Sequence, residues 1–234
     1  MNILIAGGTG FIGRQLCQHL LANGHHLIIR TRSPESVNRS AFDTASTNES
    51  GQGRVMSISD LSQLSVDQKI DVAINLAGEP IANKRWTSTQ KHIIRESRLS
   101  ITQEFITFFE RLNQLPALFI SSSAIGYYGI GYQGSETPDD EITETSNADN
   151  SFSSTLCHDW ENCAMQARTL GIRTCILRTG IVLGSGGGAL GKMLLPFKCG
   201  LGGKIGTGSQ WMPWIALSDM ISIIDFCIAQ KHLS

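Results

Sequence analysis

The chain has 234 residues, which is enough to bury a substantial core as one large domain or as a domain with an extension. Hydrophobic residues make up 41% of it and charged residues 17%, as in ordinary soluble globular proteins. The formal net charge of −1 gives no electrostatic reason to expect a nucleic acid or a membrane as a partner, and no apolar run is long enough to span a bilayer.

The cysteines are scattered along the chain without a C-x-x-C pair, at Cys17, Cys157, Cys163, Cys175, Cys199 and Cys227. Most fall in expected helices or strands, so we interpret them as buried free thiols in a reducing compartment. No His/Cys pair has zinc-site spacing, and we expect no metal site. The apolar N-terminus lacks the basic segment and the cleavage site of a signal peptide, and we therefore expect a cytoplasmic protein.

The chain begins with a short buried strand over 2–6, followed by glycines at positions 7, 10 and 13. Apolar residues then recur with helical spacing from Phe11 to Leu21. Strand, glycine turn and helix open a dinucleotide-binding unit, in which a pyrophosphate sits on the free N–H groups of the helix N-terminus. An ordinary glycine-rich turn is the alternative. The expected cofactor contacts are Gly7, Thr9, Gly10, Phe11, Ile12 and Gly13.

A second strand over 26–30 leads into Thr31 and Arg32. An acid at this place binds the adenosine ribose of NAD, whereas an arginine suits the 2′-phosphate of NADP. The first acid here is Glu35, and Arg32 with the Thr31 or Ser33 hydroxyl would form a charge-assisted phosphate clamp. A solvated basic loop is the alternative. We therefore expect NADP as the cofactor, with NAD as the less favoured choice.

Residues 35–54 are rich in Ser, Asn, Thr and Gly and are expected to form a long loop. A third strand over 54–58 follows. Asp60 comes just after it and either contacts the adenine amine or caps a helix before Leu61.

A fourth strand over 71–76 leads into small residues that would let the backbone pass close to the nicotinamide ribose. A tight turn after the strand is the structural alternative, and both interpretations are compatible. A long helix over 89–112 follows, and its Arg98 either points back at the cofactor phosphates or solvates the helix face. The expected cofactor contacts in this region are Leu76, Ala77, Gly78 and Arg98.

A fifth strand over 117–122 is followed by Ser123 and then by Tyr127 and Tyr128. A hydroxyl at the C-terminal end of a parallel strand lies in the crevice where such sheets bind ligands. Ser123 could hydrogen-bond a carbonyl or an alcohol there, although a serine turn is the alternative. We take Ser123 and Tyr128 as the candidate catalytic residues, while the neighbouring sequence offers no cation to activate either tyrosine.

Polar and acidic residues over 130–150 are expected to form a loop over the site. A helix over 152–170 and a sixth strand over 172–178 continue the alternation of strands and helices. Glycines within 180–188 indicate a mobile segment that could close over a substrate.

The remaining chain is expected to hold a short helix over 189–199, a short strand within 211–219 and a last helix over 219–230 capped by Ser218. The whole pattern predicts an α/β fold with a doubly wound parallel sheet, the Rossmann arrangement. We divide the chain into an NAD(P)-binding Rossmann domain over 1–179 and a small, incomplete substrate-binding part over 180–234.

Several short motifs are found together in this chain: Gly-Gly-Thr-Gly-Phe-Ile-Gly (7–13), Thr-Arg-Ser-Pro (31–34), Asn-Leu-Ala-Gly-Glu-Pro-Ile (75–81), Arg-Trp-Thr (85–87), Glu-Ser-Arg (96–98), Ser-Ala-Ile-Gly-Tyr-Tyr-Gly (123–129), Asp-Trp-Glu (159–161), Leu-Arg-Thr-Gly-Ile-Val-Leu-Gly (177–184) and Met-Pro-Trp-Ile (212–215). With them the chain resembles the NAD(P)-dependent epimerase-like family of atypical, extended short-chain dehydrogenases/reductases. Some bacterial members of that family carry a cell-division-inhibitor label. The resemblance implies that Thr31-Arg32, Leu76-Ala77 and Arg98 contact NADP.

The chain departs from that superfamily in two ways. Members carry a Tyr-x-x-x-Lys pair on the helix after the fifth strand, and alignment of the Asp-Trp-Glu helix places Ser153 and Cys157 there. Neither residue can replace the tyrosine or the lysine. Members also continue for some tens of residues beyond the position of Ser234, on the substrate side.

We expect from this an NADP-binding protein, similar to epimerases and oxidoreductases, that acts on a small substrate, with nucleotide-linked compounds among the candidates. The alternatives are a non-catalytic NADP-binding regulator and an inactive, truncated relative. A small molecule is the expected partner, and the sequence leaves a homo-oligomer open.

Overall fold

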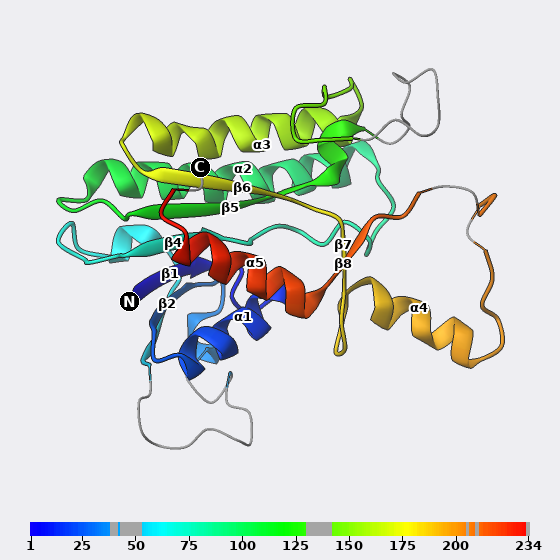
Figure 1. The fold of residues 1–234 in the computed structure, drawn as a ribbon, viewed down its shortest axis with the longest axis horizontal. Helices are drawn as coiled ribbons and strands as arrows, with labels where there is room; N and C mark the ends of the chain where they lie inside the picture. Colours follow the sequence, from blue (N-terminus) through cyan, green and yellow to red (C-terminus); the bar gives the residue numbers. More distant parts are fainter. Residues whose placement is uncertain (38–41, 43–52, 130–141, 205, 209–210, 233–234) are drawn as a thin grey trace.

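The computed structural model describes residues 1–37, 42, 53–129, 142–204, 206–208 and 211–232, which Figure 1 draws in colour. A six-stranded parallel sheet in the order β3-β2-β1-β4-β5-β6 lies at its centre. This arrangement confirms the Rossmann fold expected from the sequence. The strands are β1 (Asn2–Ala6), β2 (His26–Arg30), β3 (Val55–Ile58), β4 (Val72–Asn75), β5 (Leu118–Ala124) and β6 (Arg173–Thr179).

Helices cover both faces of the sheet, α1 and α5 on one side and α2 and α3 on the other (Figure 1). Both faces need a cover because the side chains of the central strand β1 alternate between them. Ile3 and Ile5 are fully buried with α1 and α5, whereas Leu4 and Ala6 are fully buried with α2 and α3. The helices are α1 (Phe11–Ala22), α2 (Ser88–Arg111), α3 (Phe152–Thr169) and α5 (Leu217–Ala229).

A second, two-stranded parallel sheet pairs β7 (Ile181–Leu183) with β8 (Trp214–Ala216). Between these strands runs α4 (Gly188–Lys198), which stands away from the main sheet in Figure 1 and has no buried residue. By contrast, α5 buries Leu217, Met220, Ile221 and Ile224 in the same core cluster as α1. The chain after residue 180 therefore contains one helix that belongs to the main core and one that does not.

Every strand of the main sheet and every α-helix begins and ends within two residues of its expected bounds. Asp60 caps the short 3-10 helix η3 (Leu61–Gln63) by accepting the Ser62 N–H at 2.8 Å, which is one of its two expected roles. The expected cap at Ser218 is wrong. Because β8 runs directly into α5, Ala216 occupies the N-cap position and Ser218 lies inside the first turn.

The expected loops over 35–54 and 130–150 fall largely outside the described residues. Within the described part of the chain, no helix has both the length and the apolar character needed to cross a bilayer.

Candidate cofactor and active site

The glycine turn after β1 is built around two positions that exclude a side chain. Gly7 has a φ of +81°, in the left-handed region that favours glycine. A Cβ on Gly7 would lie 2.6 Å from the Leu76 carbonyl carbon, and a Cβ on Gly13 would lie 2.1 Å from the Gly7 carbonyl oxygen. Glycine at these positions therefore lets the turn meet the loop after β4 and lets α1 lie against the turn.

The N-terminus of α1 is free of any side-chain cap. Gly10 is the N-cap residue, its N–H donates to the Gly7 carbonyl at 3.0 Å, and both Thr9 and Gly10 are exposed. The N–H groups of the first helical turn, beginning with Phe11 and Ile12, have no partner within the helix. Unpaired donors at the positive end of a helix dipole suit an anion, so this turn fits a cofactor pyrophosphate.

The Phe11 side chain packs against the glycines at the start of α4. A Cβ on Gly187 would lie 3.0 Å from the Phe11 ring, and a Cβ on Gly188 would lie 2.8 Å from it. The segment expected to close over a substrate thus lies against the first residue of α1. Whether it moves stays a prediction.

The two arginines at the end of β2 have different surroundings. Arg30 forms an ion pair with Glu104 of α2, with Nη2 and Oε2 2.7 Å apart. Arg32 is exposed and makes no ion pair with any described residue. Beside it the Thr31 Oγ1 accepts the Ser33 N–H at 3.3 Å. Arg32 is therefore the arginine that is available to a ligand phosphate.

The loop after β4 is held against α2 by Arg98. Its Nη2 donates to the Glu79 carbonyl at 3.2 Å and its Nη1 to the Ile94 carbonyl at 3.0 Å. The guanidinium carbon lies 5.3 Å from the centre of the Trp160 ring, and a Cβ on Gly78 would lie 3.0 Å from the same carbon. Arg98 therefore joins the loop after β4 to α2 and does not simply extend from α2 into solvent.

Among the described residues, Arg98 has no carboxylate at ion-pair distance. Burial lowers its pKa, because removal from water disfavours the charged form. A half-buried guanidinium without a carboxylate at ion-pair distance would be stabilised by an anionic ligand. The expected contact with the cofactor phosphates stays a prediction. Leu76 and Ala77 lie in the same loop, where the Ala77 N–H donates to Asn75 Oδ1 at 3.1 Å.

At the C-terminal ends of β5 and β6, Ser123 takes part in a network of polar side chains. Its Oγ donates to Glu161 Oε1 of α3 at 2.5 Å, and Ser123 is buried. Arg178 of β6 holds the same carboxylate through two bonds, from Nε to Oε1 at 2.9 Å and from Nη2 to Oε2 at 2.8 Å. Its Nη1 donates to the Tyr128 Oη at 3.0 Å. One partly buried ion pair thus connects the two candidate catalytic hydroxyls.

Arg178 is held by more than the carboxylate. Its guanidinium carbon lies 3.5 Å from the centre of the Tyr127 ring, and Nη1 also donates to the Glu144 carbonyl at 3.0 Å. Hydrogen bonds to Glu161 first, and then to Tyr128, raise the pKa of Arg178 above its ordinary value. The guanidinium is therefore a fixed positive charge beside the Tyr128 oxygen.

The positions expected to take the place of the Tyr-x-x-x-Lys pair do face the site. A Cβ on Gly126, in the short helix η4 (Ile125–Tyr128), would lie 3.2 Å from Ser153 Cβ and 3.7 Å from Cys157 Sγ. Burial raises the pKa of Cys157. A neutral thiol and a serine therefore line the wall of α3 on which the superfamily carries its tyrosine and lysine.

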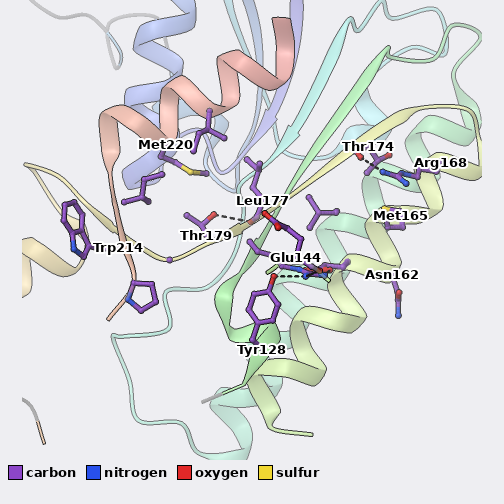
Figure 2. A pocket seen from close by; sticks show the side chains of 17 residues that line it. Tyr128, Glu144, Asn162, Met165, Arg168, Thr174, Leu177, Thr179, Trp214 and Met220 are labelled. Atoms are coloured by element: carbon purple, nitrogen blue, oxygen red, sulfur yellow. Dashed lines mark hydrogen bonds and ion pairs between the residues drawn. The ribbon is translucent and has the colours of Figure 1, made fainter. Parts of the chain in front are cut away.

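A pocket of about 640 Å³ adjoins this network between α3, β6 and α5. Figure 2 shows Tyr128 at one end, Trp214 with Met220 on one side, and Arg168 with Thr174 on the other. Arg178 and Glu161 also line it, whereas Ser123 and the glycine turn do not. Tyr128 and the ion pair therefore lie between the pocket and the end of β5.

Sequence reasoning gave Glu161 and Arg178 no role, although both lie in quoted motifs. Arg178 is directly opposite Ser123 in the parallel register of β5 and β6. The sequence signal for this contact is a charged residue, Arg178, near the C-terminal end of the strand that pairs with the strand of Ser123. The expected sites thus form two groups, the glycine turn with the loop after β4 and the hydroxyls joined by Arg178. Arg32 follows β2, the strand next to β1.

The model of the NAD dependent epimerase/dehydratase family matches residues 3–233. An epimerase family protein of Staphylococcus aureus is 37% identical over 231 residues, covering 99% of this chain and 72% of the relative. The human epimerase family protein SDR39U1, solved with NADPH, is 33% identical with a TM-score of 0.78, covering all of this chain and 72% of that one. A nucleoside-diphosphate sugar epimerase from Corynebacterium glutamicum is 29% identical with a TM-score of 0.75, covering all of this chain and 45% of that one.

Proposed function

The chain belongs to the NAD-dependent epimerase/dehydratase family, and on that premise we propose that it is a cytoplasmic, NADP-dependent oxidoreductase or epimerase-like enzyme with a small, nucleotide-linked substrate. The observation that carries this proposal is the Arg178–Glu161 ion pair, which joins the Ser123 hydroxyl to the Tyr128 phenol beside a pocket. Two hydroxyls joined beside a pocket favour an enzyme over a chain that only binds a cofactor.

The preference for NADP rests on Arg32. It is exposed at the end of β2, where the adenosine ribose binds in this fold, and no acid precedes Glu35. Thr31 would add a hydroxyl to the same phosphate. The human relative, 33% identical, was solved with NADPH, which supports the same choice.

Two backbone segments and one arginine side chain would hold the rest of the cofactor. The N–H groups of Phe11 and Ile12 would bind the pyrophosphate, and Gly7, Gly10 and Gly13 keep that turn compact. Leu76, Ala77 and Gly78 would lie along the nicotinamide ribose. Arg98, a half-buried cation without a carboxylate partner among the described residues, would face the phosphates. In the same scheme, residues 1–179 bind the cofactor and residues 180–234 contribute part of the substrate side.

Once bound, NADP would take up or return a hydride at a substrate carbon. The chain would supply the accompanying proton chemistry. The Ser123 proton is engaged by Glu161, so Ser123 presents lone pairs to a substrate hydroxyl. Tyr128 accepts a bond from Arg178 and keeps its own proton for a ligand. Tyr128 would thus act as proton donor and acceptor, with Arg178 in place of the usual lysine.

The pocket supports a polar, ring-shaped substrate. Asn162, Arg168 and Thr179 offer hydrogen bonds, and Trp214 offers an aromatic face. Sugars bind to such mixed walls through their hydroxyls and their C–H faces. The relative from Corynebacterium glutamicum, which its name calls a nucleoside-diphosphate sugar epimerase, supports a sugar nucleotide.

A second candidate is a non-catalytic, NADP-binding regulator. Ser153 and Cys157 favour it, because they line the wall where the superfamily carries its tyrosine and lysine. Such a protein would bind the cofactor at the same glycine turn but would convert no substrate.

The deciding experiment is a calorimetric titration of NADPH and of NADH into the purified chain. We expect tight binding of NADPH and weak binding of NADH. If neither binds, the proposal is rejected and the inactive relative remains.

If NADPH binds, a panel of nucleoside-diphosphate sugars is offered with NADP⁺ to the natural chain and to Ser123→Ala. Turnover that Ser123→Ala abolishes, with cofactor affinity nearly unchanged, supports the enzyme. Cofactor binding without any turnover supports the regulator, and equal turnover in both proteins removes Ser123 from the mechanism.

A further inference from the structure

Two cysteines that the proposed function does not use face each other between the edge strand and the last helix. Cys175 lies in β6 and Cys227 in α5, and both are buried in the core cluster that α1 and α5 cover. Their thiols hydrogen-bond one another. They are separated by a long stretch of chain that includes β7, α4 and β8.

A single arginine contacts both cysteines. Arg173 lies two residues before Cys175 on the same face of β6, and its Nη1 donates to the Cys175 Sγ at 3.6 Å. Its Nη2 donates to the Cys227 carbonyl oxygen at 2.9 Å. This guanidinium therefore holds the strand and the helix together at the point where the thiols meet. It also places a positive charge beside the Cys175 sulfur.

The surroundings make the two sulfurs unequal. The hydrogen bond from Cys227, with the charges of Arg173 and Arg168, lowers the pKa of Cys175 to about 6 against the opposing effect of burial. The bond to Cys175 raises the pKa of Cys227 instead. The surroundings therefore favour the thiolate form on Cys175 and the protonated form on Cys227.

The other buried cysteines are different. Burial raises the pKa of Cys17 to about 12, and it also raises the pKa of Cys157 and Cys163. Thiols of that kind react slowly with oxidants, because the thiolate is the nucleophile. Cys199 is exposed and lies at the C-terminal end of α4.

We propose that Cys175 and Cys227 are a redox-active pair that forms a reversible disulfide between β6 and α5 when the protein meets hydrogen peroxide. The Cys175 thiolate attacks one peroxide oxygen, the O–O bond breaks, and hydroxide leaves, which gives a sulfenic acid on Cys175. The Cys227 sulfur then attacks the Cys175 sulfur and displaces the hydroxyl group. That group leaves as water with the Cys227 proton, so one thiolate and one thiol are oxidised to the disulfide while one peroxide is reduced to one hydroxide and one water.

The disulfide would close a covalent loop around the whole segment that carries α4 and the β7–β8 pair. Pocket residues from that segment, such as Pro213 and Trp214, would then be joined to β6 by a covalent bond as well as by packing. Oxidation would thus tie the segment to the edge of the sheet.

The test treats the purified full chain with one equivalent of hydrogen peroxide, blocks remaining thiols with iodoacetamide, and measures the intact mass and the non-reduced peptides. We expect the natural chain to lose two alkylation sites and to yield a peptide joined through Cys175 and Cys227. Dithiothreitol should restore both sites.

Cys199→Ser is the matched control and should behave as the natural chain does, whereas Cys175→Ser and Cys227→Ser should form no disulfide. Thermal melts of the reduced proteins, compared with the natural chain, show whether each variant is folded. A disulfide that persists in either variant, or a natural chain that forms only adducts at Cys199, overturns the proposal. If both serine variants fail to fold, the peptide from the natural chain decides alone.

Discussion

Arg32 is the residue on which cofactor choice depends, because its neighbour Arg30 is already paired with Glu104. We predict that Arg32→Ala weakens NADPH binding far more than NADH binding, since only NADPH carries the 2′-phosphate. A charge-assisted contact of this kind is worth about 1.5–3 kcal/mol, which is roughly a tenfold to hundredfold change in Kd. Calorimetry with both cofactors measures it. Arg54→Ala, at the opposite end of the strands, is the control, and an equal loss for NADH would reject the clamp.

The Glu161–Arg178 pair should matter for stability as well as for the site. Its side chains are 11% and 20% exposed, so Glu161→Gln leaves a largely buried guanidinium without its countercharge. We expect a loss of about 3–5 kcal/mol in the free energy of unfolding, measured with urea. The ion pair Arg95–Asp159 is a matched control, since it has a 2.6 Å contact but exposures of 40% and 32%. Asp159→Asn should cost less than about 1 kcal/mol; equal losses would contradict this account.

At the scale of elements, the close approach of α1 to the turn after β1 depends on the absence of one side chain. A Cβ at Gly13 would meet the Gly7 carbonyl oxygen at 2.1 Å, so Gly13→Ala must push the helix away from the turn. We expect about 1–3 kcal/mol of destabilisation together with loss of NADPH binding. Gly191→Ala in α4, where nothing lies within 4 Å, should instead be neutral or up to about 1 kcal/mol stabilising. A Gly13→Ala variant that binds NADPH normally would disprove this role of the turn.

The order of strands and helices was predictable because it follows local patterns. Buried runs such as 2–6 predicted strands, and helical spacing predicted α2 and α3 to within one residue. Ser218 failed as a cap because the end of β8 determines where α5 begins, and no local pattern shows that end.

The contact between Ser123, Glu161 and Arg178 could not be predicted in the same way. It depends on the register of β5 against β6 and on which turn of α3 faces the strand ends. Likewise, nothing in the sequence near Tyr128 shows that Arg178, fifty residues later, donates to its oxygen. Local patterns predicted which residues are polar and at strand ends, and tertiary packing determined which of them meet.

At the scale of the whole molecule, the first and last helices share one core. Because α1 and α5 bury their apolar residues in the same cluster, we expect far-ultraviolet and near-ultraviolet circular dichroism to report one common thermal transition. NADPH at about 100 times its Kd should then raise the free energy of unfolding by about 2.7 kcal/mol. Two separate transitions would mean that the chain after residue 180 folds independently, and no shift with NADPH would contradict the cofactor site.

The position of β6 at the end of the strand order has a consequence for hydrogen exchange. In the described structure β1 has a neighbour on each side, whereas β6 pairs only with β5. Successive amides of a parallel strand point to opposite sides, so the amides of β1 are all bonded and those of β6 only at every second residue. Deuterium should therefore enter β6 in an alternating pattern from the native state, while β1 exchanges only through global unfolding. Any chain that came to lie along the open side of β6 would abolish that alternation.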